Sequence, residues 1–377
     1  MTHLVAPKLP AHIPSLDGLR AISIFLVLIA HAAATSGAPQ WLDRPMFTSL
    51  GNVGVRFFFV ISGFLITTLL LRDIEKYGRI RLKLFYLRRA LRILPAAYCF
   101  MAVMWLLHAA GVIDLTFHVP SRTHVASALP SLLHAATFTA NYAHDYNWYF
   151  NHLWTLSVEE QFYLLWPFTI FLFGLRRATV VGCTILLAVP LLRLVTYEFG
   201  TGPEIALSRE FHAVADALAT GCLGTIFFNW LTNNAIFASL ARAPAIPLGG
   251  ALVALGYGAA FVSRPAAYVF GQTAANLGVL LILQHVVRYP DLWAGRLLNS
   301  RPLVGIGVLS YSLYLWQEPF LFFLGTSWAT AFPQNIVFAI GAASVSYYVV
   351  ERPALRLKDR LSTSARPARG GSSGGYT

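Results

Sequence analysis

Ten stretches of this sequence are each long and apolar enough to cross a lipid bilayer as an α-helix, which takes about 20 residues. Of the 377 residues, 56% are hydrophobic and 12% are charged, whereas soluble proteins average about 25% charged residues. We therefore expect an all-α, multi-pass membrane protein with about ten transmembrane helices. The expected spans are residues 15–34, 52–71, 91–110, 153–174, 178–197, 211–231, 246–262, 269–287, 303–324 and 332–350.

The basic residues predict the orientation of these spans, because short loops rich in Lys and Arg stay in the cytoplasm. An N-terminus inside the cell places most Lys and Arg on the cytoplasmic side, and both termini then lie there. Topology and anionic lipid explain the net charge of +12, so no nucleic-acid partner is expected. The cytoplasmic basic residues are Arg72, Lys76, Arg79, Arg81, Lys83, Arg88, Arg89, Arg176, Arg177, Arg288, Arg296, Arg301, Arg352, Arg356, Lys358 and Arg360.

We expect one membrane domain, residues 1–360, followed by a disordered cytoplasmic tail, residues 361–377. No cleavable signal peptide is apparent, so the first span should itself direct insertion. The three cysteines, Cys99, Cys183 and Cys222, fall inside apolar spans without CxxC spacing. They indicate neither a disulfide framework nor a zinc site, and no metal site is predicted.

The first span carries two ionisable residues, Arg20 and His31, although such residues cost several kcal/mol in a bilayer and usually face the bundle interior. Their separation of eleven residues places both on one helix face, about 16 Å apart along the axis. The alternative interpretation is that Arg20 reaches the cytoplasmic headgroups and His31 ends the span at the outer interface.

A second basic cluster, "FYLRRALRILP", runs directly into the third span. Arg89 and Arg92 lie at i and i+3 one turn before Pro95, and such a pair of guanidinium groups suits a phosphate ligand. Arg88 and Arg92, at i and i+4, fit equally well by spacing. Ordinary charge on the cytoplasmic side is the alternative.

Two further segments place polar side chains at membrane depth. If residues 151–168 are helical throughout, His152, Glu159 and Tyr163 share one face, where a carboxylate could orient a histidine or accept a proton. Near the end, "SYSLYLWQEPF" contains Tyr311, Tyr314 and Gln317. These three residues support the site at most, and packing of the aromatic side chains is the alternative.

Taken together, six blocks resemble the acyltransferase 3 family of integral-membrane acyltransferases. They occur in the family's order and cover essentially the whole chain: "SLDGLRAISIFLVLIAHA", "NVGVRFFFVISGFLIT", "FYLRRALRILP", "HLWTLSVEEQFYLLWP", "SYSLYLW" and "SYYVVERP". The resemblance implies that acyl-coenzyme A, most commonly acetyl-CoA, binds from the cytoplasm as a donor substrate, with no permanently bound cofactor. The acyl group would pass to a hydroxyl of a carbohydrate, glycolipid or exopolysaccharide across a bacterial cytoplasmic (inner) membrane.

The resemblance also implies roles for individual residues. The family's Arg and His of the first span fall on Arg20 and His31, and its RxxR pair falls on Arg89 and Arg92. His31 would be the general base or a transient acyl carrier, with Glu159 available to orient it. Ser62 of the "SGF" block would join the three arginines around the coenzyme. Independently of the resemblance, the two polar segments described above give the expected substrate contacts: His152, Tyr163, Tyr311, Tyr314 and Gln317.

The chain departs from the family pattern at two places. Arg56 lies where an acidic residue is common, and Gln317 and Glu318 follow "SYSLYLW" where many members have histidine. Some members carry a fused esterase-like domain, and this chain is expected to be the form without one. The alternatives are a transporter or flippase-like protein of surface-polysaccharide assembly, which would also have many spans and intramembrane charges, and a purely structural assembly partner.

Overall fold

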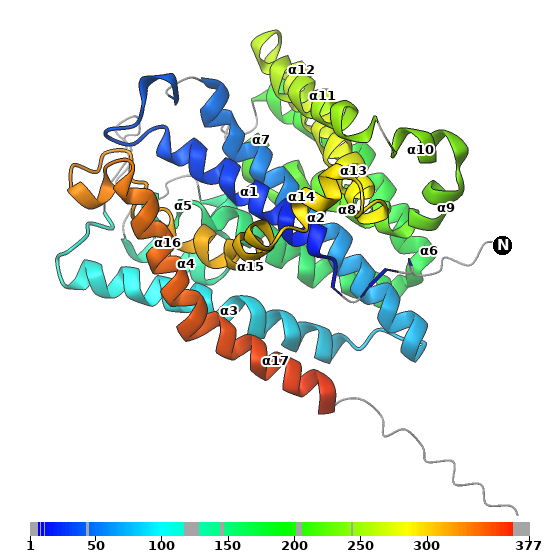
Figure 1. Ribbon diagram of the computed structural model, residues 1–377, viewed down its shortest axis with the longest axis horizontal. Helices are drawn as coiled ribbons and strands as arrows, with labels where there is room; N and C mark the ends of the chain where they lie inside the picture. Colours follow the sequence, from blue (N-terminus) through cyan, green and yellow to red (C-terminus); the bar gives the residue numbers. More distant parts are fainter. Residues whose placement is uncertain are drawn as a thin grey trace, which may run out of the picture.

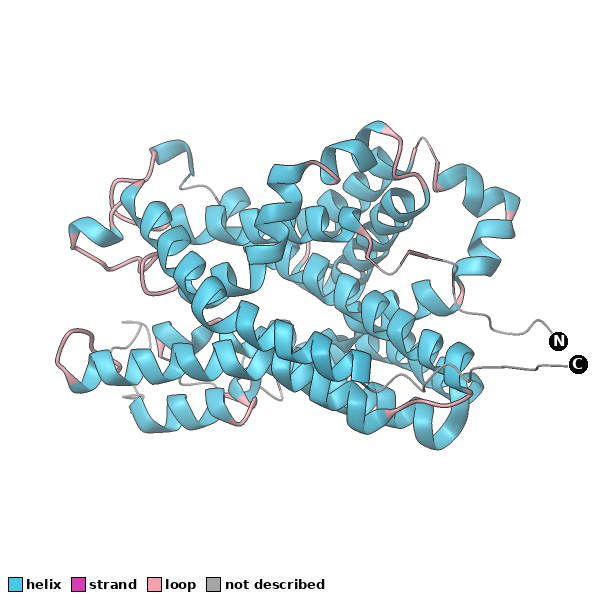
Figure 2. Ribbon diagram, turned by 60° about the horizontal axis from the view of Figure 1, so that its bottom comes forward, coloured by secondary structure: helices cyan, strands magenta, loops and turns pink. Residues whose placement is uncertain are grey.

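The computed structural model describes residues 7, 9–10, 12–42, 45–116, 128–143, 147–200, 206–242 and 244–364. Within these residues the chain forms helices joined by turns and contains no strand, as Figure 2 shows. The predicted all-α fold is therefore confirmed for this part of the chain.

The helices are labelled in chain order in Figure 1. The longer ones are α1 (Pro14–Ala32), α2 (Pro45–Tyr77), α3 (Leu82–Ala109), α6 (Leu153–Phe199), α8 (Phe211–Ile226), α11 (Ala245–Gly258), α13 (Gln272–Arg288), α15 (Arg301–Trp316), α16 (Gln334–Ser346) and α17 (Arg352–Ser364). The shorter ones are α4 (Ala128–Ala136), α5 (Trp148–Asn151), α7 (Ala206–Arg209), α9 (Phe228–Asn233), α10 (Ala235–Leu240), α12 (Arg264–Ala266) and α14 (Trp293–Leu298).

Five helical segments of the described chain are long and apolar enough to cross a membrane. They are Pro14–Ala32, Ser49–Tyr77, Leu82–Ala109, Trp148–Phe199 and Arg264–Arg288. The fourth is too long for a single crossing, since at 1.5 Å per residue its 52 residues would extend about 78 Å. Gly174 interrupts it with a φ of 74°. This glycine is the last residue of the predicted span 153–174 and precedes the span 178–197.

The predicted span 303–324 is wrong beyond Trp316, where α15 ends. Pro319 explains the end of the helix, because a proline lacks the backbone N–H and disfavours helical geometry in the residue before it. Gln317 and Glu318 consequently lie at the end of the helix, and both are buried.

The helix α1 crosses the middle of the bundle and packs against α2, α13, α14 and α15 (Figure 1). The helix α2 in turn packs closely against α8. A Cβ atom on Gly63 would lie 2.1 Å from the backbone oxygen of Leu218, and one on Gly221 would lie 2.1 Å from that of Val60. Only glycine permits this backbone approach, a common device in membrane helix packing.

The helix α17 lies beside α3 at the edge of the bundle (Figure 1). It continues to Ser364, so the first four residues of the predicted disordered tail, 361–364, are helical. The rest of the predicted tail lies outside the described residues.

Candidate active site

Three arginines from two helices meet near the start of α1. Arg20 of α1 and Arg89 and Arg92 of α3 all line a cavity of about 410 Å³, together with Arg72 of α2 and Lys358 of α17. Arg20 forms an ion pair with Asp17 at 3.3 Å. The packing of α1 and α3 thus brings the two predicted basic clusters together. Arg88, the alternative left open by spacing, does not line this cavity.

The same three arginines also line a second, smaller cavity of about 90 Å³, here called the inner cavity. Ser62 of α2 and Glu159 and Tyr163 of α6 also line it. The Glu159 carboxylate accepts hydrogen bonds from the Ser62 hydroxyl at 2.8 Å and from the Tyr163 hydroxyl at 3.2 Å. The inner cavity and the larger cationic cavity therefore share the side chains of Arg20, Arg89 and Arg92.

The predicted residues Tyr311 and Tyr314 of α15 also line the inner cavity, and their hydroxyl groups join helices. The Tyr311 hydroxyl donates to the backbone oxygen of Ile93 at 2.8 Å. The Tyr314 hydroxyl donates to the backbone oxygen of His152 at 2.9 Å and accepts from Thr155 at 2.7 Å. Tyr314 therefore connects the inner cavity to the surroundings of His152.

His31, near the far end of α1, lies against the residues that follow α15. Its Nδ1 is 2.9 Å from Oε1 of Gln317, and its Nε2 is 4.0 Å from Oε1 of Glu318. The Trp148 ring meets the His31 ring edge-on and donates through its Nε1 to the backbone oxygen of Glu318 at 3.0 Å. The His31 side chain is 29% exposed, so a ligand can reach the imidazole.

Glu318 lies between two histidines. Its Oε1 is 3.8 Å from Nδ1 of His152, and both side chains are 1% exposed. Among the described residues, neither carboxylate oxygen of Glu318 and neither ring nitrogen of His152 has a hydrogen-bond partner. Buried polar atoms without partners are uncommon and suggest a functional reason.

The structure corrects two expectations about this region. Glu159 does not contact His31 but belongs to the inner cavity with Ser62 and Tyr163, while His31 contacts Gln317 and Glu318. The segment 151–168 is not one helix, because α5 ends at Asn151 and α6 begins at Leu153. The His152 ring lies 3.8 Å from Glu318, while Glu159 and Tyr163 share a face as predicted.

Sequence reasoning did not assign a role to Glu318. Two features of the sequence could have drawn attention to it. Gln317 and Glu318 stand where many family members have histidine, and Pro319 follows directly. No group of three or more His, Cys, Asp or Glu side chains with the arrangement of a metal site occurs in the described part of the chain.

Comparison with known proteins gives a family match over nearly the whole chain. A family model described as an acyltransferase domain, that of acyltransferase 3, matches residues 13–350. The peptidoglycan O-acetyltransferase OatA of Listeria monocytogenes is 29% identical over 335 residues, which cover 82% of this chain and 49% of that protein. The O-acetyltransferase OatA of Staphylococcus aureus is 29% identical over 378 residues, covering 91% of this chain and 57% of that protein.

The chain thus spans about half the length of the curated relatives it matches. No solved structure matches it significantly.

Proposed function

Because this chain belongs to the acyltransferase 3 family, we propose that it is a membrane O-acetyltransferase. In this proposal it takes an acetyl group from cytoplasmic acetyl-CoA and transfers it to a hydroxyl of a carbohydrate acceptor on the other side of a bacterial cytoplasmic membrane. The names of both relatives support O-acetyl transfer, and the name of one supports a cell-wall glycan as acceptor. The transporter alternative gains no support from these relatives.

The observation that carries the proposal is the pair of neighbouring cavities that share Arg20, Arg89 and Arg92 as lining residues. The wider cavity suits the phosphates of the coenzyme, because guanidinium groups bind phosphate through several parallel hydrogen bonds. The narrow inner cavity suits the slender pantetheine arm and its thioester. Its lining by Ser62 and Glu159 supports a role for these two residues on the donor side.

We assign the proton transfer to His31. Nδ1 of His31 lies 2.9 Å from the side-chain oxygen of Gln317. In the tautomer that carries its proton on Nδ1 and donates it to this oxygen, Nε2 can take the proton of the acceptor hydroxyl. In direct transfer the acceptor oxygen attacks the thioester carbonyl, the C–S bond breaks, and His31 returns the proton to the departing coenzyme thiolate. In the alternative route, Nε2 of His31 attacks the thioester carbonyl, the C–S bond breaks and the coenzyme leaves as the thiolate. The acceptor oxygen then attacks the acetyl-imidazole carbonyl, the N–C bond breaks, and the hydroxyl proton neutralises the thiolate.

Glu318 supports this role of His31, since a carboxylate 4.0 Å from Nε2 would stabilise the imidazolium that forms after proton transfer. The carboxylate acts on the imidazole and not on the substrate, so Glu318 is a positioning residue in this proposal.

Residues near both ends of the chain line the arginine cavity, so the donor is expected on the side of the membrane where the termini lie. His12 and Asp17 from the N-terminal part and Leu355 and Lys358 from α17 line the same cavity as the arginines. We propose that both termini are cytoplasmic and that the chain crosses the membrane about ten times, with the shorter helices α8, α11, α15 and α16 contributing crossings.

Purified protein incubated with labelled acetyl-CoA and a panel of glycans tests the proposal. We expect acetyl-CoA to bind, coenzyme A to be released faster when an acceptor is present, and His31→Ala to abolish transfer while the protein still binds the donor. Failure to bind any acyl-CoA would overturn the proposal. Acetyl transfer that is unchanged in His31→Ala would overturn the assigned role of His31.

A further inference from the structure

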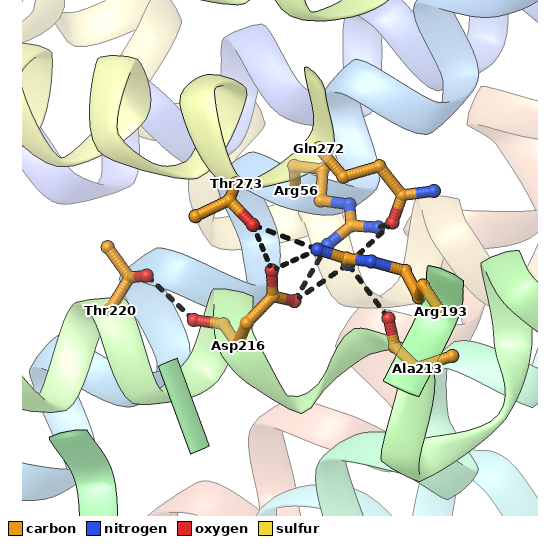
Figure 3. Close-up of polar contacts among 7 residues, drawn as sticks. All are labelled: Arg56, Arg193, Ala213, Asp216, Thr220, Gln272 and Thr273. Carbon is orange, nitrogen blue, oxygen red and sulfur yellow. Dashed lines mark hydrogen bonds and ion pairs between the residues drawn. The ribbon is translucent and has the colours of Figure 1, made fainter. Parts of the chain in front are cut away.

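A buried cluster of charges lies outside the candidate active site. It joins Arg56 of α2, Arg193 of α6, Asp216 of α8, and Gln272 and Thr273 of α13 (Figure 3). One oxygen of Asp216 accepts from both guanidinium groups at 3.3 Å, and the other accepts from Arg193 at 2.9 Å and from Thr273 at 3.1 Å. The side-chain oxygen of Gln272 accepts from Arg193 at 2.8 Å and also from Arg56.

The charges of this cluster do not balance. Two guanidinium groups face one carboxylate, and the side chains of Arg56, Arg193 and Asp216 are 6%, 0% and 0% exposed. An uncompensated charge is costly in a region withdrawn from water. The cluster would be better balanced with one further negative charge beside it.

A cavity of about 420 Å³ opens beside the cluster, lined by Arg56 and Gln272 and by the aromatic residues Trp154, Tyr257 and Tyr268. None of the described residues that line it is acidic. Flat aromatic faces beside a few directed polar groups are typical of small-molecule sites, and sugar rings present apolar faces together with hydroxyl groups that fit such a lining.

This cavity of about 420 Å³ lies close to the inner cavity, since Val55 lines both. Most of its other lining residues come from the start of α2 and from the chain between α11 and α13, including Ser49, Asn52 and Arg264. In the proposed topology these parts face away from the cytoplasm. An acceptor that enters from the outer side would therefore meet this cavity.

We propose that this cavity binds the anionic group of the acceptor glycan, a carboxylate or phosphate carried on a sugar, with Arg56 as its partner. The inference rests on the proposed acetyltransferase function and names a property of its acceptor. It also gives Arg56 a purpose at a position where the family pattern commonly has an acidic residue, because an acidic side chain there would repel such a ligand.

Equilibrium binding to the purified full chain tests this inference. The probes are N-acetylmuramic acid, which carries a carboxylate, its neutral counterpart N-acetylglucosamine, and N-acetylglucosamine-1-phosphate. We expect the wild type to bind at least one acidic sugar about tenfold more tightly than the neutral one, and the preference to weaken as salt concentration rises. The two acidic probes distinguish a carboxylate from a phosphate.

Two variants, one that removes a positive charge and one that removes a negative charge, distinguish a ligand-binding role of Arg56 from a structural role. Arg56→Gln removes one positive charge and should abolish the preference for the acidic sugar, whereas Asp216→Asn removes the opposing charge and should preserve or increase it. Both break the same ion pair, so a purely structural role would lower thermal stability and binding in both. Arg177→Gln, at an exposed position on α6, is the matched control and should change neither.

Equal binding of acidic and neutral sugars by the wild type would overturn the inference, as would parallel losses of binding in Arg56→Gln and Asp216→Asn. Acetyl-CoA binding is measured on the same preparations. Intact donor binding without any preference for acidic sugars rejects the anionic site alone, whereas absent donor binding rejects the proposed function.

Discussion

At the scale of single residues, Glu318 is the group whose chemistry is most sharply testable. Its carboxylate is buried, has no hydrogen-bond partner in the described chain, and lies within 4.0 Å of His31 and 3.8 Å of His152. We expect Glu318→Gln to lower kcat roughly 10- to 100-fold, since the imidazolium of His31 loses its counter-charge, while the KM for acetyl-CoA stays constant. Steady-state kinetics on the purified variant measure both values.

The pH profile distinguishes this positioning role from mere packing. If Glu318 acts through His31, its substitution should also move the acidic limb of the kcat profile, because the neighbouring charge changes. The control is Glu198→Gln, an exposed carboxylate at the end of α6, which should leave the profile unchanged. A loss of thermal stability with an unaltered profile in the surviving enzyme would contradict the role.

Arg92 and Arg88 form a second contrast at this scale, because spacing alone gave no reason to prefer one of them. Arg92 lines both donor-side cavities, and Arg88 lines neither. We expect Arg92→Ala to raise the Kd for acetyl-CoA at least about tenfold, as loss of a charge-assisted hydrogen bond implies. Arg88→Ala, a substitution one turn away on the same helix, should change the Kd less than about threefold, because Arg88 lines neither cavity. Similar effects of both would contradict the phosphate assignment.

The sequence predicted which side chains lie together on one helix. It did not predict the contacts that form where a helix ends and the chain turns. Helical phase placed Glu159 beside Tyr163, and the family resemblance selected Arg89 and Arg92. The contact between His31 and Gln317 joins positions 286 residues apart, which no local pattern can reveal. It also requires α15 to end before Pro319, whereas a hydropathy scan reads the apolar residues beyond that proline as a continuing helix.

At the scale of helices, the contact between α2 and α8 depends on backbone proximity. A Cβ on Gly63 would lie 2.1 Å from the backbone oxygen of Leu218, so Gly63→Ala must separate the two helices. We expect a loss of about 1–3 kcal/mol of stability, the usual cost of overpacking, and a lower thermal midpoint. Gly341→Ala, in α16 with no atom within 4 Å of the added Cβ, should leave stability equal or slightly higher. A Gly63→Ala midpoint equal to that of Gly341→Ala would contradict this packing.

At the scale of the whole molecule, the break at Gly174 determines how the chain crosses the membrane. A straight helix over Trp148–Phe199 could not fit a hydrocarbon core of about 30 Å, so the segment should cross twice, with Gly174 near the cytoplasmic surface. Arg177 and Glu198, both exposed, should then lie on opposite sides. In a variant without the three native cysteines, Glu198→Cys should react with an impermeant maleimide added to intact cells or spheroplasts.

The partner variant, Arg177→Cys, should react only after the membrane is permeabilised. Trp41→Cys, in the connection between α1 and α2 and 59% exposed, should behave like Glu198→Cys, whereas Arg79→Cys, between α2 and α3, should behave like Arg177→Cys. This pattern places His31 towards the outer surface and the arginine cavity towards the cytoplasm, the arrangement that transfer across the membrane requires. Labelling of Arg177→Cys and Glu198→Cys from the same side would remove the crossing assigned to the second half of α6. Labelling of Trp41→Cys and Arg79→Cys from the same side would exclude the proposed separation of donor from acceptor.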